Sequence, residues 1–228
     1  MKRKNKSHLV LFILMCVALN INAQPSYELR TGLNLNTRNS PLYKPINEGD
    51  NTPYKLGYQA GILVNFSSKQ KLNYQTGLEY INKKSSYERQ NFSNWNPGIS
   101  DITETSIHYL EIPFCALYEI KKINFLFGGY TAFGLSGNSN ITDSNGTYEE
   151  KLSPNYGKVS IDDEDNYFRG FDLGLRVGAA YEISSFRFYL LYSYGLISTT
   201  PVFEGQESAS GLNLMNKTIS LSVGYIIN

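Results

Sequence analysis

From residue 24 onward, apolar positions recur along the chain with a period of two. Eight segments follow this alternation, at residues 29–35, 56–66, 72–80, 110–120, 123–135, 171–183, 186–196 and 219–227. Successive side chains of a β-strand point to opposite faces, so each segment predicts a strand with one apolar face. That face carries no Asp, Glu, Lys or Arg in any of the eight segments. The pattern therefore predicts an all-β protein.

The opposite face of the same segments is polar and rich in glycine. Its charged residues predict a network inside the fold, formed by Arg30, Lys55, Glu79, Glu111, Glu119, Asp172, Arg176, Glu182 and Arg187. Glu28 lies on the same face. A buried charge left without a partner is strongly destabilising, so these residues are expected to pair. The alternative is that they line a path for protons or small ions.

Which face lies inside follows from the size of an eight-stranded barrel. Its lumen is only just wide enough for its own side chains, which suits glycines and paired charges better than many Phe, Tyr and Leu. An apolar face turned to lipid also avoids Lys and Arg, which cost about 2–4 kcal/mol near mid-membrane. We predict an eight-stranded antiparallel up-and-down transmembrane β-barrel with a polar, side-chain-filled lumen. A soluble barrel with its apolar face inside is the alternative.

The connections between the segments alternate in length. Residues 37–53, 82–108, 136–170 and 197–217 form long connections, while 67–71, 121–122 and 184–185 form short ones. Outer-membrane barrels have short periplasmic turns and longer extracellular loops. The rhythm predicts four long extracellular loops and places both termini in the periplasm.

The start of the chain has the composition of an export signal. A basic stretch precedes the apolar run 8–19, and Ala23 offers a small residue for cleavage. We therefore predict a cleaved signal peptide at residues 1–23 and a barrel at residues 24–228, located in the outer membrane. Cys115 is then the remaining cysteine, which excludes an intramolecular disulfide. The formal net charge of +1 gives no reason to expect a nucleic-acid partner.

Several motifs resemble those of a known family. Tyr109-Leu110-Glu111-Ile112-Pro113 resembles a strand-opening motif of the PorT-like outer-membrane β-barrels of Bacteroidetes. Residues 171–174, 192–196 and 220–225 resemble later strands of that family, so the likeness spans essentially the whole mature chain. The resemblance implies an outer-membrane barrel but no single activity, although the name-giving member is associated with protein secretion. The chain departs from many such barrels by ending on Asn228 rather than on an aromatic residue.

Three features offer other chemistry. Pro113 lacks a backbone donor and predicts a bulge or a local opening in its strand. His108, with Ser106 and Glu104 nearby in sequence, is the one candidate for a lipid-modifying catalytic site, although no nucleophile motif supports it. The acidic run at residues 162–165 lacks the spaced ligands of a calcium loop, so no metal and no cofactor are expected.

These observations favour a non-enzymatic surface barrel. It would act in surface interaction, in envelope integrity or as a component of a secretion or uptake complex, with protein partners bound through its extracellular loops. Its other expected partners are outer-membrane lipids, lipopolysaccharide and, during biogenesis, the barrel-assembly machinery. A narrow channel for ions or small solutes is the first alternative, and a lipid-modifying enzyme is the second.

Overall fold

The computed structural model describes residues 24–39, 52–67, 71–93, 96–143, 146–160, 166–204 and 214–227. The predicted signal peptide at residues 1–23 and the acidic run at residues 162–165 lie outside these ranges. Within them, no helix is long and apolar enough to cross a membrane.

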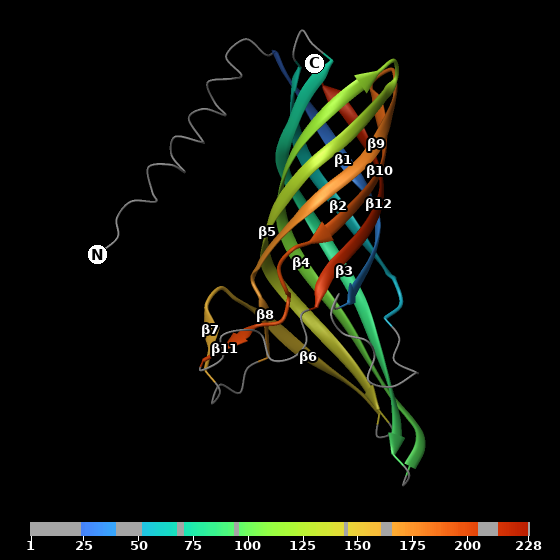
Figure 1. Cartoon of the computed structure of the whole chain (residues 1–228), viewed down its shortest axis with the longest axis vertical. Coiled ribbons are helices and arrows are strands. Elements are labelled where there is room, and N and C mark those ends of the chain that lie inside the picture. The colour runs from blue at the N-terminus through green and yellow to red at the C-terminus, as the bar shows by residue number, and fades with distance from the viewer. Residues whose placement is uncertain are drawn as a thin grey trace, which may run out of the picture.

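Eight long strands close into a ring (Figure 1). They are β1 (Gln24–Asn39), β2 (Lys55–Ser67), β3 (Leu72–Ser93), β4 (Asn96–Ile120), β5 (Ile123–Asp143), β9 (Phe171–Ile183), β10 (Phe186–Gly195) and β12 (Met215–Ile227). Each strand pairs antiparallel with its neighbour along the chain, and β12 closes the ring onto β1. The predicted eight-stranded antiparallel barrel is confirmed.

Four shorter strands lie at one end of the ring. They are β6 (Gly146–Asn155), β7 (Lys158–Val159), β8 (Tyr167–Arg169) and β11 (Val202–Phe203). β6 extends the β5 ladder antiparallel, β8 pairs parallel with the end of β6, and β7 pairs parallel with β11. Figure 1 shows all four beyond the lower rim, at the end of the barrel away from the C-terminus.

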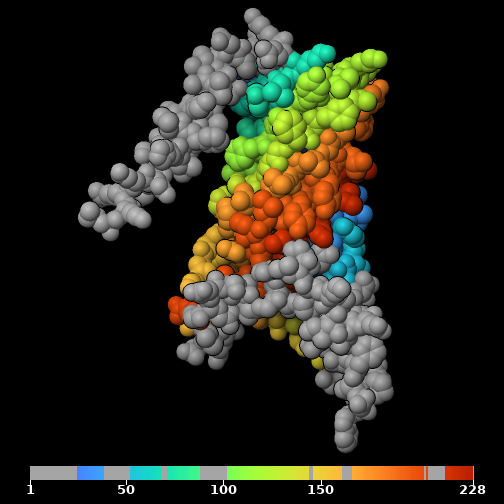
Figure 2. Space-filling model, in the orientation of Figure 1, coloured from blue at the N-terminus to red at the C-terminus, as the bar shows by residue number. Residues whose placement is uncertain are grey.

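The outer wall of the barrel is apolar, as the alternation predicts. The outward apolar side chains are largely exposed, with Leu221 at 67%, Leu190 at 59% and Phe114 at 56%. Figure 2 shows the strands forming a continuous wall that runs obliquely to the long axis. An exposed apolar belt of this extent would be unfavourable in water, so the wall fits contact with lipid.

The connections agree with the prediction at one end and differ at the other. Tight two-residue turns join β4 to β5 and β9 to β10, and Lys121 and Ser184 in these turns adopt the left-handed conformation, with φ of 58° and 54°. The connections predicted at 82–108 and 136–170 are largely strands rather than loops, because β3, β4, β5 and β6 continue well past the apolar belt. A β-ladder needs backbone hydrogen bonds but no apolar face, so the alternation ends before the strands do.

Pro113 opens the ladder locally but does not cause a bulge. β3 and β4 keep one register on both sides of it, with Thr76 opposite Phe114 and Glu79 opposite Glu111, and the ladder is interrupted in between. The register shift of β4 lies instead between His108 and Tyr109, against β5. Because proline cannot donate a ladder hydrogen bond, the interruption falls on the β3 side of that residue.

Candidate functional site

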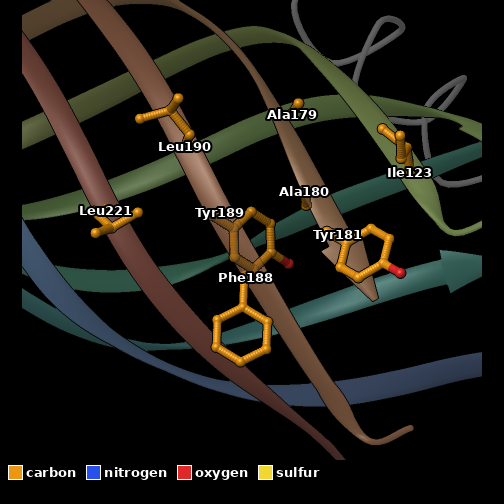
Figure 3. Close-up of a pocket in the computed structure, with 8 residues that line it drawn as sticks. All are labelled: Ile123, Ala179, Ala180, Tyr181, Phe188, Tyr189, Leu190 and Leu221. Atoms are coloured by element: carbon orange, nitrogen blue, oxygen red, sulfur yellow. The ribbon is translucent and has the colours of Figure 1, made fainter. Parts of the chain in front are cut away.

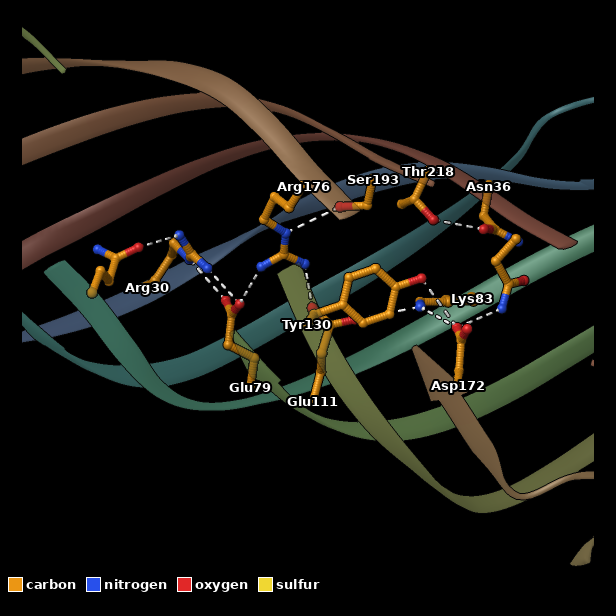
Figure 4. Close-up of polar contacts among 12 residues, drawn as sticks. Arg30, Asn36, Glu79, Lys83, Glu111, Tyr130, Asp172, Arg176, Ser193 and Thr218 are labelled. Carbon is orange, nitrogen blue, oxygen red and sulfur yellow. Dashed lines mark hydrogen bonds and ion pairs between the residues drawn. The ribbon is translucent and has the colours of Figure 1, made fainter. Parts of the chain in front are cut away.

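The interior of the barrel holds a layer of ion pairs (Figure 4). At its centre, Glu79 of β3 accepts hydrogen bonds from two guanidinium groups. Arg30 of β1 donates through Nε at 2.7 Å, and Arg176 of β9 donates through Nη1 at 3.1 Å. All three side chains are at most 3% exposed. Inward-facing positions of three strands therefore meet at one carboxylate.

The layer continues from Arg176 toward the end of the barrel that carries the short strands. Arg176 also pairs with Glu111, and Lys83 Nζ lies 3.3 Å from Glu111 Oε2 and 3.0 Å from Asp172 Oδ2. Asp172 further accepts hydrogen bonds from the Tyr130 hydroxyl at 3.2 Å and from Asn216 Nδ2 at 2.9 Å. Each carboxylate in this part of the network thus has a cationic partner.

A second cluster lies toward the opposite end of the lumen. Glu28 accepts a hydrogen bond from the Tyr189 hydroxyl at 2.6 Å and pairs with Arg187 at 2.9 Å. Arg187 also pairs with Glu182 at 2.7 Å. The guanidinium of Arg30 lies 4.8 Å from the centre of the Tyr189 ring, so this cation–π contact connects the two clusters.

The lumen-facing charges of the two clusters balance. Four carboxylates, Glu28, Glu79, Glu111 and Asp172, face four cations, Arg30, Lys83, Arg176 and Arg187. Glu182 adds a further carboxylate where the side chain is already 37% exposed. The ions within the two clusters therefore compensate one another, as charges removed from water require.

Two predicted members of the network lie elsewhere. Lys55 pairs with Glu104, and their side chains are 35% and 50% exposed. Lys55 keeps the register of β2 with β1, opposite the buried Asn36, but it is the first residue of β2, where its side chain is part-exposed and pairs with Glu104 rather than with a buried carboxylate. Glu119 is exposed beside the turn after β4, where the strand has already left the lumen.

Lys83 is the network member that the sequence reasoning missed. The apolar alternation ends at residue 80, so the predicted strand stopped there, whereas β3 continues to Ser93. The two-residue spacing of inward positions could have identified it. Glu79, Ile81 and Lys83 are successive inward residues of β3, and each is 2% exposed.

The lumen also contains two apolar clusters, which the sequence analysis did not predict. One consists of Ile81, Ile107, Tyr109, Tyr130, Ala132 and Phe168. The other consists of Cys115, Leu117, Leu126, Ala180, Tyr189 and Leu191. The filled lumen is therefore partly polar and partly a conventional apolar core. In so narrow a lumen, inward side chains contact one another rather than water, so apolar residues are favourable there too.

Phe168 packs inside the lumen near the end that carries the short strands. It belongs to β8, is 2% exposed and packs edge-to-face on Tyr109, with ring centroids 6.0 Å apart. Its segment is fixed to the barrel by a backbone hydrogen bond of 2.6 Å from Gly134 N to Gly170 O. The Tyr156 hydroxyl donates to Gly134 O, also at 2.6 Å. The connection between β5 and β9 therefore inserts an aromatic side chain into the interior.

His108 lies on the outer face of β4, apart from the lumen. Its Nδ1 is 2.6 Å from the Tyr80 hydroxyl, and its ring stacks on that of Tyr80 at 5.7 Å. Ser106 Oγ accepts a hydrogen bond from Asn82, and Glu104 pairs with Lys55. In the described part of the chain, no contact joins His108 to Ser106 or Glu104 as a catalytic triad would require. The described residues also contain no group of three or more His, Cys, Asp or Glu that could hold a metal.

An open hollow lies on the outer wall, over β9, β10 and β12 (Figure 3). The short side chain of Ala179 lies among the outward side chains of Tyr181, Phe188, Leu190 and Leu221. The hollow is apolar and belongs to the exposed apolar belt, so it is part of the lipid-facing surface rather than an entrance to the lumen.

Close packing in the lumen predicts a clear effect of substituting Gly174. A methyl group at this inward position would lie 2.5 Å from the carbonyl oxygen of Tyr194 and would overlap the Tyr130 ring. We expect Gly174→Ala to lower the free energy of unfolding by about 1–3 kcal/mol, the usual cost of overpacking. Denaturant titration followed by circular dichroism in detergent measures it. Gly157→Ala is the control, since a methyl group there meets nothing nearer than 3.9 Å. Equal effects of the two substitutions would contradict the prediction.

A closed antiparallel ring with an apolar exterior and paired charges inside defines a membrane-spanning β-barrel. A family model described as "Outer membrane protein beta-barrel domain" matches residues 22–200. The chain belongs to this family, and the protein is an outer-membrane β-barrel.

Similar solved structures include neisserial surface protein A, with 11% identity, a TM-score of 0.46, and coverage of 89% of this chain and 98% of that one. The attachment invasion locus protein Ail of Yersinia pestis, in complex with sucrose octasulfate, shows 12% identity, a TM-score of 0.41, and coverage of 90% and 99%. OprG of Pseudomonas aeruginosa shows 11% identity, a TM-score of 0.32, and coverage of 90% and 97%. A search of curated proteins finds no match.

Proposed function

We propose that the protein is a non-enzymatic barrel with a closed lumen, which acts through the surface that it presents outside the cell. The observation that carries this proposal is the interior, where charge-balanced ion pairs and two apolar clusters occupy the lumen. With the lumen filled, the remaining surface for interaction is the part that extends past the membrane. Its roles would be surface interaction, envelope integrity, or participation in a secretion or uptake complex.

The lengths of four strands support this proposal. A strand needs about 9–11 residues to cross a membrane. β3, β4 and β5 have 22, 25 and 21 residues, and β6 adds 10 residues to the same sheet. β3 to β6 therefore continue past the apolar belt as one four-stranded sheet. This sheet would carry the adjoining loops beyond the membrane.

The orientation and the narrower family assignment belong to the same proposal. The short turns lie at the end of the barrel where β1 begins and β12 ends, and short turns are periplasmic in barrels of this class. Both termini are accordingly proposed to be periplasmic and the four-stranded sheet extracellular. Membership of the PorT-like barrels of Bacteroidetes, supported by residues 109–113, would make a secretion-related role one of the options.

The first test is electrical. Reconstituted into a planar bilayer, the mature protein is expected to give no conductance above the background of protein-free detergent, because ion pairs, apolar clusters and Phe168 occupy the lumen. A porin reconstituted in parallel shows that the assay detects channels. Reproducible single-channel steps from the wild-type protein would contradict the closed lumen and favour the alternative, a narrow ion or solute channel that uses the same charges.

The second test concerns the extracellular sheet. Replacing residues 86–103 by a short turn removes the tip of the β3–β4 hairpin and leaves the belt and lumen intact. In a deletion strain, this variant should reach the outer membrane in folded form yet fail to restore the surface-adhesion and envelope-sensitivity phenotypes that the full chain restores. A trimmed barrel that restores every phenotype would rule out a role for the hairpin.

A further inference from the structure

The outer face of the extended sheet carries a polar row that crosses four strands. Lys84 of β3 pairs with Ser106 of β4, Ser106 pairs with Asn138 of β5, and Asn138 pairs with Lys151 of β6. Both lysines are exposed, whereas the adjacent Lys83 and Ile107 are buried in the lumen. The lysine row, defined by these four paired residues, therefore faces away from the barrel axis and along the outside of the wall.

The lysine row lies just above the apolar belt. Leu110 is the outward apolar residue of β4 nearest to the row, and His108 separates it from Ser106. Four residues of a strand tilted by about 40° rise about 10 Å along the membrane normal. The polar headgroup layer is about 5–8 Å thick, and a lysine side chain can bend back toward it. The adjoining rings of Tyr58, Tyr80 and His108, of which Tyr80 and His108 stack, lie below the row, where aromatic residues mark the membrane interface.

The chemistry of the lysine row suits phosphate groups. Ser106 Oγ accepts a hydrogen bond of 2.8 Å from Asn82 Nδ2, so its own O–H is free to donate to a ligand. Lys84 and Lys151 lie at the two ends of the row, about 14 Å apart from strand spacing alone. Carboxylates occur one row further out, where Glu104 pairs with Lys55 and Glu149 accepts from Asn138 at 2.9 Å. An anion is therefore favoured along the lysine row and disfavoured along the next row outward.

We propose that the lysine row binds the phosphate groups of a phosphorylated glycolipid in the outer leaflet, with Lys84 and Lys151 contacting separate phosphates of one headgroup. Two features favour a lipid over a free anion. The row lies on the outside of the wall beyond the apolar belt, where lysine side chains can bend back to the headgroup layer, and the wall beneath it is apolar and able to contact the acyl chains. The site faces the outer leaflet in the cell only if the four-stranded sheet is extracellular, as proposed above. The affinity of the purified protein for the phosphorylated lipid does not depend on that orientation.

The experiment uses the folded mature barrel in neutral detergent micelles, titrated with bisphosphorylated lipid A and followed by native mass spectrometry. Lys84→Gln/Lys151→Gln is expected to weaken binding by about ten- to thirty-fold, as two surface lysines acting on anionic lipid would. The control is Lys71→Gln/Lys122→Gln, which makes the same charge change at exposed positions at the other end of the barrel. It should stay within about twofold of wild type, because a nonspecific charge effect is small when the charges are remote from the site.

Two further measurements separate the possible outcomes. Dephosphorylated lipid A should bind weakly to the wild type, and millimolar inorganic phosphate should not displace the bisphosphorylated lipid. Equal losses in the two double variants, or undiminished binding of the dephosphorylated lipid, would overturn the proposal. Displacement by inorganic phosphate would assign the row to free anions and would equally overturn the lipid assignment. Because these measurements involve neither conductance nor the hairpin tip, their failure is distinguishable from failure of the proposed function.

Discussion

Substituting Arg176 by methionine is expected to produce the largest loss of stability in this barrel. Its guanidinium pairs with Glu79 and Glu111 and donates through Nε to Ser193 Oγ at 3.0 Å, with the side chain 3% exposed. Methionine keeps much of the volume but leaves the two carboxylates with less compensating charge. Removing one partner of a buried ion pair typically costs about 3–5 kcal/mol. Unfolding by guanidinium chloride in detergent, followed by circular dichroism, measures the free energy of unfolding.

A second-site change tests whether the loss comes from the uncompensated charge. Adding Glu111→Gln to Arg176→Met removes one of the two carboxylates and should recover at least about 1 kcal/mol. Lys122→Met, at an exposed turn position, is the matched control and should lie within about 0.5 kcal/mol of wild type. If Arg176→Met and Lys122→Met have the same free energy of unfolding, the ion pairs of Arg176 do not contribute to the stability of the barrel.

The second large effect is expected on the outer wall. Leu221 is 67% exposed and is flanked by Leu33 on β1 and Leu190 on β10. Leu221→Arg in a phospholipid bilayer should lower the free energy of unfolding by about 2–4 kcal/mol, because the cation would face hydrocarbon. The measurement is reversible unfolding from lipid vesicles.

The control for the wall is the same substitution outside the apolar belt. Ser153 of β6 is exposed and lies on the extended part of the sheet, so Ser153→Arg is expected to change stability by less than about 0.5 kcal/mol. If both arginine substitutions cost the same, Leu221 does not face hydrocarbon. If Leu221→Arg left the free energy of unfolding unchanged, the result would instead favour the soluble barrel, which the alternation alone did not exclude.

The hydrophobic pattern predicted the parts of the barrel that depend on single strands. Whether Leu33, Leu190 or Leu221 points outward follows from its position in an alternation that local sequence contains in full. The tight turns at residues 121–122 and 184–185 follow similarly from two short gaps between long apolar segments. The pattern failed where β3 to β6 leave the membrane, because pairing beyond the belt depends on backbone hydrogen bonds that place few demands on side chains.

The interior required the tertiary structure, because it depends on how strands are staggered around the ring. The sequence placed Arg30, Glu79, Glu111, Asp172 and Arg176 on one face but not in pairs, since residues 49 to 97 positions apart meet only at one particular stagger. Lys83 belongs to the interior because β3 continues past its apolar part. Phe168 belongs to the interior because β8 places its side chain against Tyr109.

The chain by itself therefore determined that eight strands would present a lipid-facing wall and a charged inner face, because that property repeats within each strand. The register between strands decided the rest. It selected which charges compensate one another, and it aligned Lys84 with Lys151 across four strands. Each of these outcomes depends on distances between distant segments, which the alternation within one strand does not encode.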